Sequence, residues 1–145
     1  MNPKKVYLLF LSLCVIWILL ILTAPYLAHK NYTYLSGHLY RIFSHVCHQR
    51  PERSFFLWGH PLGVCARCTF IYMGGLVGML LYPLRFGKGV SFKIVVLFGI
   101  PLIIDGASQL LFRESTNEIR AVTGFLLGTV IPFYVLPKFF ESLKK

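Results

Sequence analysis

Charge is scarce in this sequence, and negative charge is scarcest of all. Charged residues make up 14% of the chain, with 5 Asp and Glu against 15 Lys and Arg. Hydrophobic residues make up 56%, whereas an average soluble domain is roughly half apolar and a quarter charged. The apolar excess lies in runs long enough to cross a bilayer. This balance excludes an ordinary soluble domain and favours an integral membrane protein.

Three familiar catalytic motifs are missing. The sequence holds no glycine-rich phosphate-binding loop, no Gly-x-Ser-x-Gly nucleophile elbow and no His-Glu-x-x-His motif. Phosphoryl transfer at such a loop, serine hydrolysis of that type and zinc proteolysis are therefore without support. The motifs leave open whether the protein is an enzyme.

A net charge of +10 does not by itself indicate a nucleic-acid-binding protein. No basic helix is interleaved with polar contact residues, and Lys and Arg lie mostly at the ends of apolar runs. At these positions they act as topology signals and contact anionic lipid. The expected partners are the lipid bilayer and its anionic headgroups, and not nucleic acid.

Four apolar runs predict an all-α, polytopic membrane protein that forms one domain over residues 1–145. The expected spans are residues 6–24, 64–82, 90–112 and 120–140. The first run has the basic flank of a secretory signal peptide. It is longer than the roughly 7–15 residues of a signal core, which favours a retained span. Cys14 inside this run is expected to be an inert, packed thiol.

The first loop carries the pattern of an amphipathic helix at the membrane interface. Its apolar residues recur at three- and four-residue spacings, which is typical of one helical face: Leu35, Leu39, Ile42, Phe43 and Val46. Ser36 and Gly37 are expected to open this helix, and Pro51 ends the helical pattern. The segment 55–58 is expected to dip into the interface, where Trp is favoured.

Two further patterns concern helix packing and helix ends. Small residues four apart let helix backbones approach closely, and they occur as Gly74-xxx-Gly78 and Gly124-xxx-Gly128. Ser115 is followed three residues later by Glu118, which is the spacing of a capping box. Ser115 is therefore predicted to cap the fourth span.

Residues that can bind metal gather between Ser44 and Tyr72. Cys65-x-x-Cys68 with Cys47 and a histidine supplies the ligands of a Cys₃His zinc site. His48 is the predicted fourth ligand. The leading hypothesis is a zinc site that is either structural or supports hydrolysis of a membrane-associated substrate.

The same thiols allow two redox interpretations. On an extracytoplasmic face thiols tend to be oxidised, and a Cys-x-x-Cys pair near Arg67 would have a lowered thiol pKa. Cys47, Cys65 and Cys68 could then form a thiol-disulfide oxidoreductase that works against a membrane quinone. The alternative is a structural disulfide that pins the loop to the second span.

Asp105 is an acidic residue within a span, where an unpaired charge is costly. We expect it to be buried and paired with Arg67 or Arg120, with Gln109 holding its second oxygen. These three charged residues are the candidate catalytic groups. A third functional class, a small homo-oligomeric transporter, would use Asp105 as its ion site. The residues expected to bind substrate are Arg50, Arg53, Gln109 and Asn117.

The distribution of basic residues predicts the topology. Lys and Arg are slightly more numerous on the side that holds both termini, so these are placed in the cytoplasm. The first loop, the start of the second span, the end of the third and the connection 113–120 then share the extracytoplasmic face. All the unusual polar residues are expected to converge there.

Several of these residues lie in stretches that resemble a known family. The segments CHQRPERSF and CARCTFIYMGG, with Asp105-x-x-x-Gln109 and ESTNEIRAVTG, resemble the signature of a family of small prokaryotic membrane proteins of unknown function. The likeness covers roughly residues 43–128. It implies that these residues belong to one site, and it implies no activity.

Overall fold

The computed structural model describes residues 3–85, 89–111 and 114–142. The described chain is mostly helical, as the apolar runs predict. Its α-helices are α1 (Pro3–His29), α2 (Thr33–Ser44), α3 (Ala66–Leu81), α4 (Phe92–Leu111) and α5 (Asn117–Ser142). Its short elements are the 3₁₀ turns η1 (Pro51–Arg53) and η2 (Tyr82–Arg85) and the strands β1 (Phe56–Leu57) and β2 (His60–Pro61).

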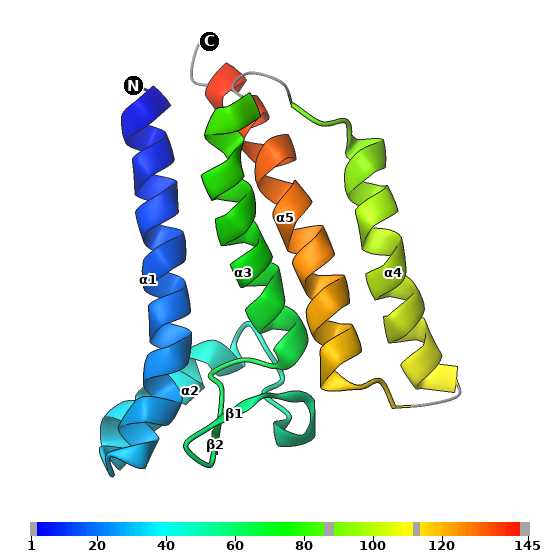
Figure 1. Cartoon of the computed structure of the whole chain (residues 1–145). Coiled ribbons are helices and arrows are strands. Elements are labelled where there is room, and N and C mark those ends of the chain that lie inside the picture. Colours follow the sequence, from blue (N-terminus) through cyan, green and yellow to red (C-terminus); the bar gives the residue numbers. More distant parts are fainter. Residues whose placement is uncertain (1–2, 86–88, 112–113, 143–145) are drawn as a thin grey trace.

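Four helices, α1, α3, α4 and α5, are long and apolar enough to cross a membrane. They stand side by side, with α3 and α5 at the centre, α1 beside α3 and α4 beside α5 (Figure 1). Large apolar side chains cover the outside of this bundle, and Ile103 and Ile104 on α4 are 62% and 63% exposed. Such a surface is stable against lipid tails and not against water. The predicted polytopic all-α membrane fold is confirmed.

Glycines form the contact between α3 and α5, which is the most extensive helix pair in the structure. A Cβ on Gly74 would collide with the Phe125 carbonyl, and one on Gly128 with the Ile71 carbonyl. The predicted close packing is therefore confirmed, because each glycine pair lies against the backbone of the other helix. We call the four residues Gly74, Gly78, Gly124 and Gly128 the glycine seam.

The first loop folds against the end of α1. Phe43 of α2 is 1% exposed and packs with Ile21 of α1, while Leu35 and Ile42 remain 53% and 54% exposed. This division fits an amphipathic helix with one side on the protein and one in the interface. The helix begins at Thr33, before the predicted start. Ser36 does not open it, because its hydroxyl is buried and donates to the Ala24 carbonyl at 2.9 Å.

A two-stranded hairpin follows in place of a simple interfacial dip. β1 and β2 pair antiparallel across a two-residue turn, in which Trp58 (φ 52°) and Gly59 (φ 79°) both adopt left-handed conformations. Positive φ at both positions is the signature of a type I′ turn. The Trp58 ring packs on Tyr26 and stacks on His29 at the end of α1. The hairpin is thereby fixed to the first span.

The predicted cap of the last helix is wrong by one residue. The backbone N–H of Ile119 donates to the Thr116 hydroxyl oxygen at 3.4 Å, so Thr116 caps α5. Ser115 instead donates its hydroxyl to the Thr116 carbonyl. The chain enters the helix one residue later than the Ser115–Glu118 spacing suggests, and the hydroxyl nearest the first helical N–H groups takes the cap.

Candidate functional site

The polar side chains gather at the end of the bundle opposite the two termini. The first loop, the start of α3, the end of α4 and the start of α5 meet there (Figure 1), so the predicted convergence is confirmed. They enclose a pocket of about 320 Å³, which we call the polar mouth. Its lining residues are Val46, Cys47, His48, Gln49, Arg50, Arg53, Cys65, Arg67, Cys68, Gln109 and Arg120.

Three thiols form one wall of the polar mouth. The sulfur atoms of Cys47, Cys65 and Cys68 all lie within 4.8 Å of one another, and all three are free thiols. Cys65 immediately precedes α3, and Cys68 lies in its first turn. Cys47 follows α2 and is 8% exposed. Cys14 lies elsewhere, with its sulfur 3.9 Å from the Tyr72 carbonyl.

The three thiols do not hold their protons equally. Hydrogen bonds from the side chains of Cys65 and Cys68 lower the pKa of Cys47 well below its usual value. The backbone N–H of Cys65 also donates to the Cys47 sulfur at 3.2 Å. The hydrogen bond to Cys47 in turn raises the pKa of Cys65. These donors stabilise the thiolate form of Cys47, and a thiolate is the form that binds metal or attacks a disulfide.

Gln49 fixes the loop that carries Cys47, although we did not predict a role for it. Its side-chain amide donates to the carbonyls of Tyr40 at 2.8 Å and Gly63 at 2.7 Å. Gln49 also has a left-handed backbone with φ 48°. These bonds tie the end of α2 to the segment before α3. Its place in the CHQ motif was the signal that could have identified it.

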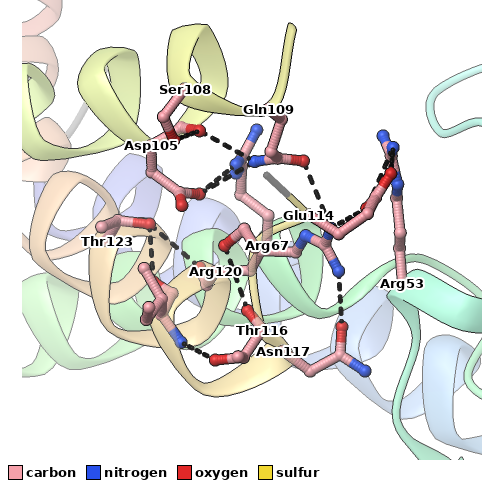
Figure 2. A network of polar contacts seen from close by, with 12 residues as sticks. Arg53, Arg67, Asp105, Ser108, Gln109, Glu114, Thr116, Asn117, Arg120 and Thr123 are labelled. Carbon is pink, nitrogen blue, oxygen red and sulfur yellow. Dashed lines mark hydrogen bonds and ion pairs between the residues drawn. The ribbon is translucent and has the colours of Figure 1, made fainter. Parts of the chain in front are cut away.

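Arg67 and Asp105 form a buried ion pair behind the thiols. Arg67 Nη2 lies 2.5 Å from Asp105 Oδ2, and the Asp105 side chain is 3% exposed. The predicted pairing is confirmed. Gln109 also donates to Oδ2, at 3.1 Å, so the expectation that it holds the second oxygen is wrong. The reason is that the Gln109 amide lies one turn along α4 on the same side as the Arg67 guanidinium (Figure 2).

The glycine seam places these charged groups. Gly124 lies one turn after Arg120, and because it lacks a Cβ the α5 backbone can approach the carbonyl of Arg67 closely. Gly106 of α4 lies beside the guanidinium of Arg67, whose Nη1 is 3.7 Å from where a Cβ would lie, so a side chain there would make an ordinary contact. The close helix contact therefore brings side chains from α3, α4 and α5 to one place.

Arg120 is the centre of a second set of bonds. Its guanidinium donates to Asn117 Oδ1 at 3.0 Å, Gln109 Oε1 at 3.2 Å and Glu114 Oε2 at 3.1 Å. Glu114 also accepts from Arg53 Nη2 at 3.0 Å, which links the first loop to α5 (Figure 2). The guanidinium groups lower the pKa of Glu114, with Arg53 as the larger cause. Glu114 lies in the quoted ESTNEIRAVTG segment, but we did not predict its role.

The remaining predicted residues have different places. His48 lines the polar mouth and is exposed, but its ring is not among the ligand atoms that lie within 4.8 Å of one another. The structure therefore does not bring this predicted fourth ligand to the thiols. Arg50 is also exposed and lines the mouth. Asn117 is occupied in bonding, because it accepts from Arg120 and donates to the Ser54 carbonyl at 3.2 Å.

Comparison with known proteins gives a family and relatives. A family model described as predicted membrane protein (DUF2085) matches residues 47–134. An uncharacterized protein of Methanocaldococcus jannaschii is 45% identical over 153 residues, which cover 98% of this chain and 97% of the relative. An uncharacterized protein of Methanothermobacter thermautotrophicus is 39% identical over 105 residues, or 70% of this chain and 92% of the relative. No solved structure matches.

Proposed function

The chain belongs to the family of predicted membrane proteins DUF2085, and we propose that it is a membrane protein that binds zinc through Cys47, Cys65 and Cys68. The observation that carries the proposal is that these three sulfurs lie within 4.8 Å of one another in the wall of an arginine-lined pocket. The pocket would hold an anionic, membrane-associated substrate. In the predicted topology it opens outside the cytoplasm.

The thiols fit the chemistry of zinc. Zinc binds thiolates at about 2.3 Å in tetrahedral geometry, which requires sulfurs roughly 3.8 Å apart. The observed limit of 4.8 Å needs little adjustment. Cys47 supplies a thiol with a strongly lowered pKa, which favours binding because the ligand must lose its proton. Three soft ligands favour zinc over magnesium or calcium, which prefer oxygen.

Three protein ligands leave one coordination position for a further group. A zinc ion with such a position supplies a Lewis acid and lowers the pKa of a bound water. Arg50, Arg53 and Arg67 line the same pocket and can bind and orient an anionic group beside the thiols. If His48 moves to fill the position, the site is closed and structural. If it does not, the site can support hydrolysis.

The test is the metal content of purified protein. The full chain in detergent should contain stoichiometric zinc, and Cys65→Ser should lose it and expose Cys47 and Cys68 to alkylation. Cys14→Ser is the matched control, because Cys14 lies away from the cluster, and it should keep the metal. Three freely alkylated thiols in metal-free wild-type protein would contradict the proposal.

A second candidate is a thiol-disulfide oxidoreductase. The observation that favours it is the low pKa of Cys47 beside the Cys65-x-x-Cys68 pair. Two thiols would form one S–S bond and give two electrons and two protons to a membrane quinone, which becomes the quinol. A count of free thiols that rises by two on reduction, in protein without zinc, would favour this candidate over the first.

The transporter interpretation has less support. It uses Asp105 as a free ion site, whereas Asp105 is bonded to Arg67 and Gln109. Asp105 is also absent from the lining of the polar mouth and lies behind it. We therefore assign Asp105 the role of positioning Arg67, and Arg120 holds Gln109 in place through its bond to Oε1.

A further inference from the structure

The Glu114 carboxylate lies between two arginines, in a position that the oxyanion of a ligand could also occupy. Its carboxylate accepts from Arg53 at 3.0 Å on one side and from Arg120 at 3.1 Å on the other. The two arginines come from η1 and α5, and both line the polar mouth. Carboxylates and phosphates bind guanidinium groups through the same pairs of N–H donors. The arginines therefore form a site whose chemistry suits any compact oxyanion.

The three side chains differ in how firmly they are held. Arg120 is 4% exposed and is bonded to Asn117 and Gln109 as well, so its guanidinium stays in place without Glu114. The Glu114 side chain is 70% exposed. An exposed carboxylate can leave such a pair at little cost, because water replaces its hydrogen bonds. The arginines form the fixed part of the site, and Glu114 is the exchangeable part.

The charge balance of the polar mouth favours an added anion. Four arginines line it, and the described acidic groups bonded to them are Asp105 and Glu114. Among the described contacts Arg50 makes no ion pair. Within the same set, the buried Nε atoms of Arg53 and Arg67 have no hydrogen-bond partner. The mouth thus has more donors than its own carboxylates can satisfy.

We propose that Arg53 and Arg120 form an oxyanion-binding subsite of the polar mouth, which Glu114 occupies as an internal competitor until a ligand displaces it. The ligand class is a phosphate or carboxylate, either free or as a lipid headgroup. This inference deepens the proposed function, because it places the anionic group of the substrate beside the thiols. It also makes Glu114 the residue that sets the affinity of the site.

The experiment titrates purified full-length protein in neutral detergent with inorganic phosphate and follows the heat of binding. Glu114→Gln removes the competing charge at nearly constant shape, and we expect about tenfold tighter binding of phosphate. Arg53→Gln should abolish that binding. Glu52→Gln is the matched control, because it removes one carboxylate next to Arg53 that makes no ion pair among the described residues, and it should change the affinity by less than about twofold.

Three further measurements make the result decisive. Glu114→Asp keeps the charge but shortens the side chain, so it should bridge the arginines poorly and bind phosphate with intermediate affinity even if Glu114→Gln is unstable. A titration with an anionic phospholipid distinguishes a lipid headgroup from free phosphate, and tighter binding of either supports the subsite. If metal-stripped Glu114→Gln also binds phosphate more tightly than metal-stripped wild type, the subsite is supported whatever the result of the zinc test. Glu114→Gln that binds phosphate and the lipid no more tightly than Glu52→Gln overturns the inference.

Discussion

In the glycine seam α3 and α5 meet backbone to backbone, whereas at the polar mouth side chains from the same helices carry charge. The atoms nearest to a Cβ at Gly128 would all be backbone atoms of Ile71. Near the mouth, Arg67 of α3 and Arg120 of α5 both reach partners on α4, which are Asp105 and Gln109. The seam depends on shape, and the mouth depends on charge. The two regions should therefore respond differently to pH, salt and substitution.

The glycine seam also explains why the site lies where it does. Close approach of two backbones excludes both lipid and water and gives the helix ends a fixed separation. Charged groups at those ends can then meet across short distances, where their bonds are stronger than in water. The seam is therefore a condition for the mouth, because a wider gap at Gly124 would move Arg120 away from the α3 end that carries Arg67.

The largest expected effect concerns which end of the bundle faces outward. If the polar mouth is extracytoplasmic, a cysteine introduced at Tyr34, which is 76% exposed in α2, should take up more of a membrane-impermeant thiol reagent in intact cells than the wild type with its native thiols does. Leu84→Cys at the opposite end is the control, since that side chain is 80% exposed and should react after permeabilisation only. Labelling with the reverse pattern would place the mouth in the cytoplasm.

The next prediction removes charge from the mouth. Asp105→Asn leaves the Arg67 guanidinium without its carboxylate and should lower the free energy of unfolding by about 3 kcal/mol. This is the low end for a buried pair, because Arg67 is 24% exposed. Adding Arg67→Gln should recover part of the loss. Unfolding by a denaturing detergent measures the stability of the single and the double variant. A single variant as stable as the wild type would show that the pair contributes nothing.

A smaller effect is expected from the seam. Gly128→Ala puts a methyl group against the Ile71 carbonyl and should cost about 2 kcal/mol, because the backbones must separate. Gly37→Ala is the control, since a Cβ there meets nothing within 4 Å, and it should stabilise α2 by about 0.5–1 kcal/mol. Arg67→Gln should recover none of the Gly128→Ala loss, in contrast to that of Asp105→Asn, because the seam carries no charge that the second change could relieve. Equal recovery of both losses by Arg67→Gln would remove the distinction between the two regions.

The sequence predicts the seam better than the mouth, for a physical reason. Small residues four apart lie on one helical face whatever surrounds them, so the glycine pairs and the four apolar helices follow from local periodicity. The ion pair of Asp105 with an arginine was also predictable, because an unpaired charge within a span is costly. The helices and the seam are therefore predictable from periodicity, and the ion pair is predictable from the cost of an unpaired charge.

The bonds within the mouth did not follow from the sequence. The roles of Gln49 and Glu114 depend on how an irregular loop crosses the helix ends, and no periodic pattern reports that path. The errors at Gln109 and Ser115 have another cause, since each depends on which of two nearby atoms a side chain reaches. His48 adjoins Cys47 in the sequence, yet the turn after α2 leaves its ring outside the group of thiol sulfurs.

The smallest expected effect is the pH dependence of the Glu114 contacts. The two arginines lower the pKa of Glu114 in the folded protein, so its contribution to stability is complete above the pKa of the unfolded chain, about 4.3. The contribution is lost as the pH falls through the folded pKa. The wild type should therefore melt roughly a degree or two above Glu114→Gln near pH 7, and the two curves should converge as the pH falls below the unfolded value. Because Glu114 is exposed, added salt should narrow the gap. Gly128→Ala should show no such convergence with the wild type. A difference in melting temperature between wild type and Glu114→Gln that persists at low pH would mean that the carboxylate charge does not hold the first loop to α5.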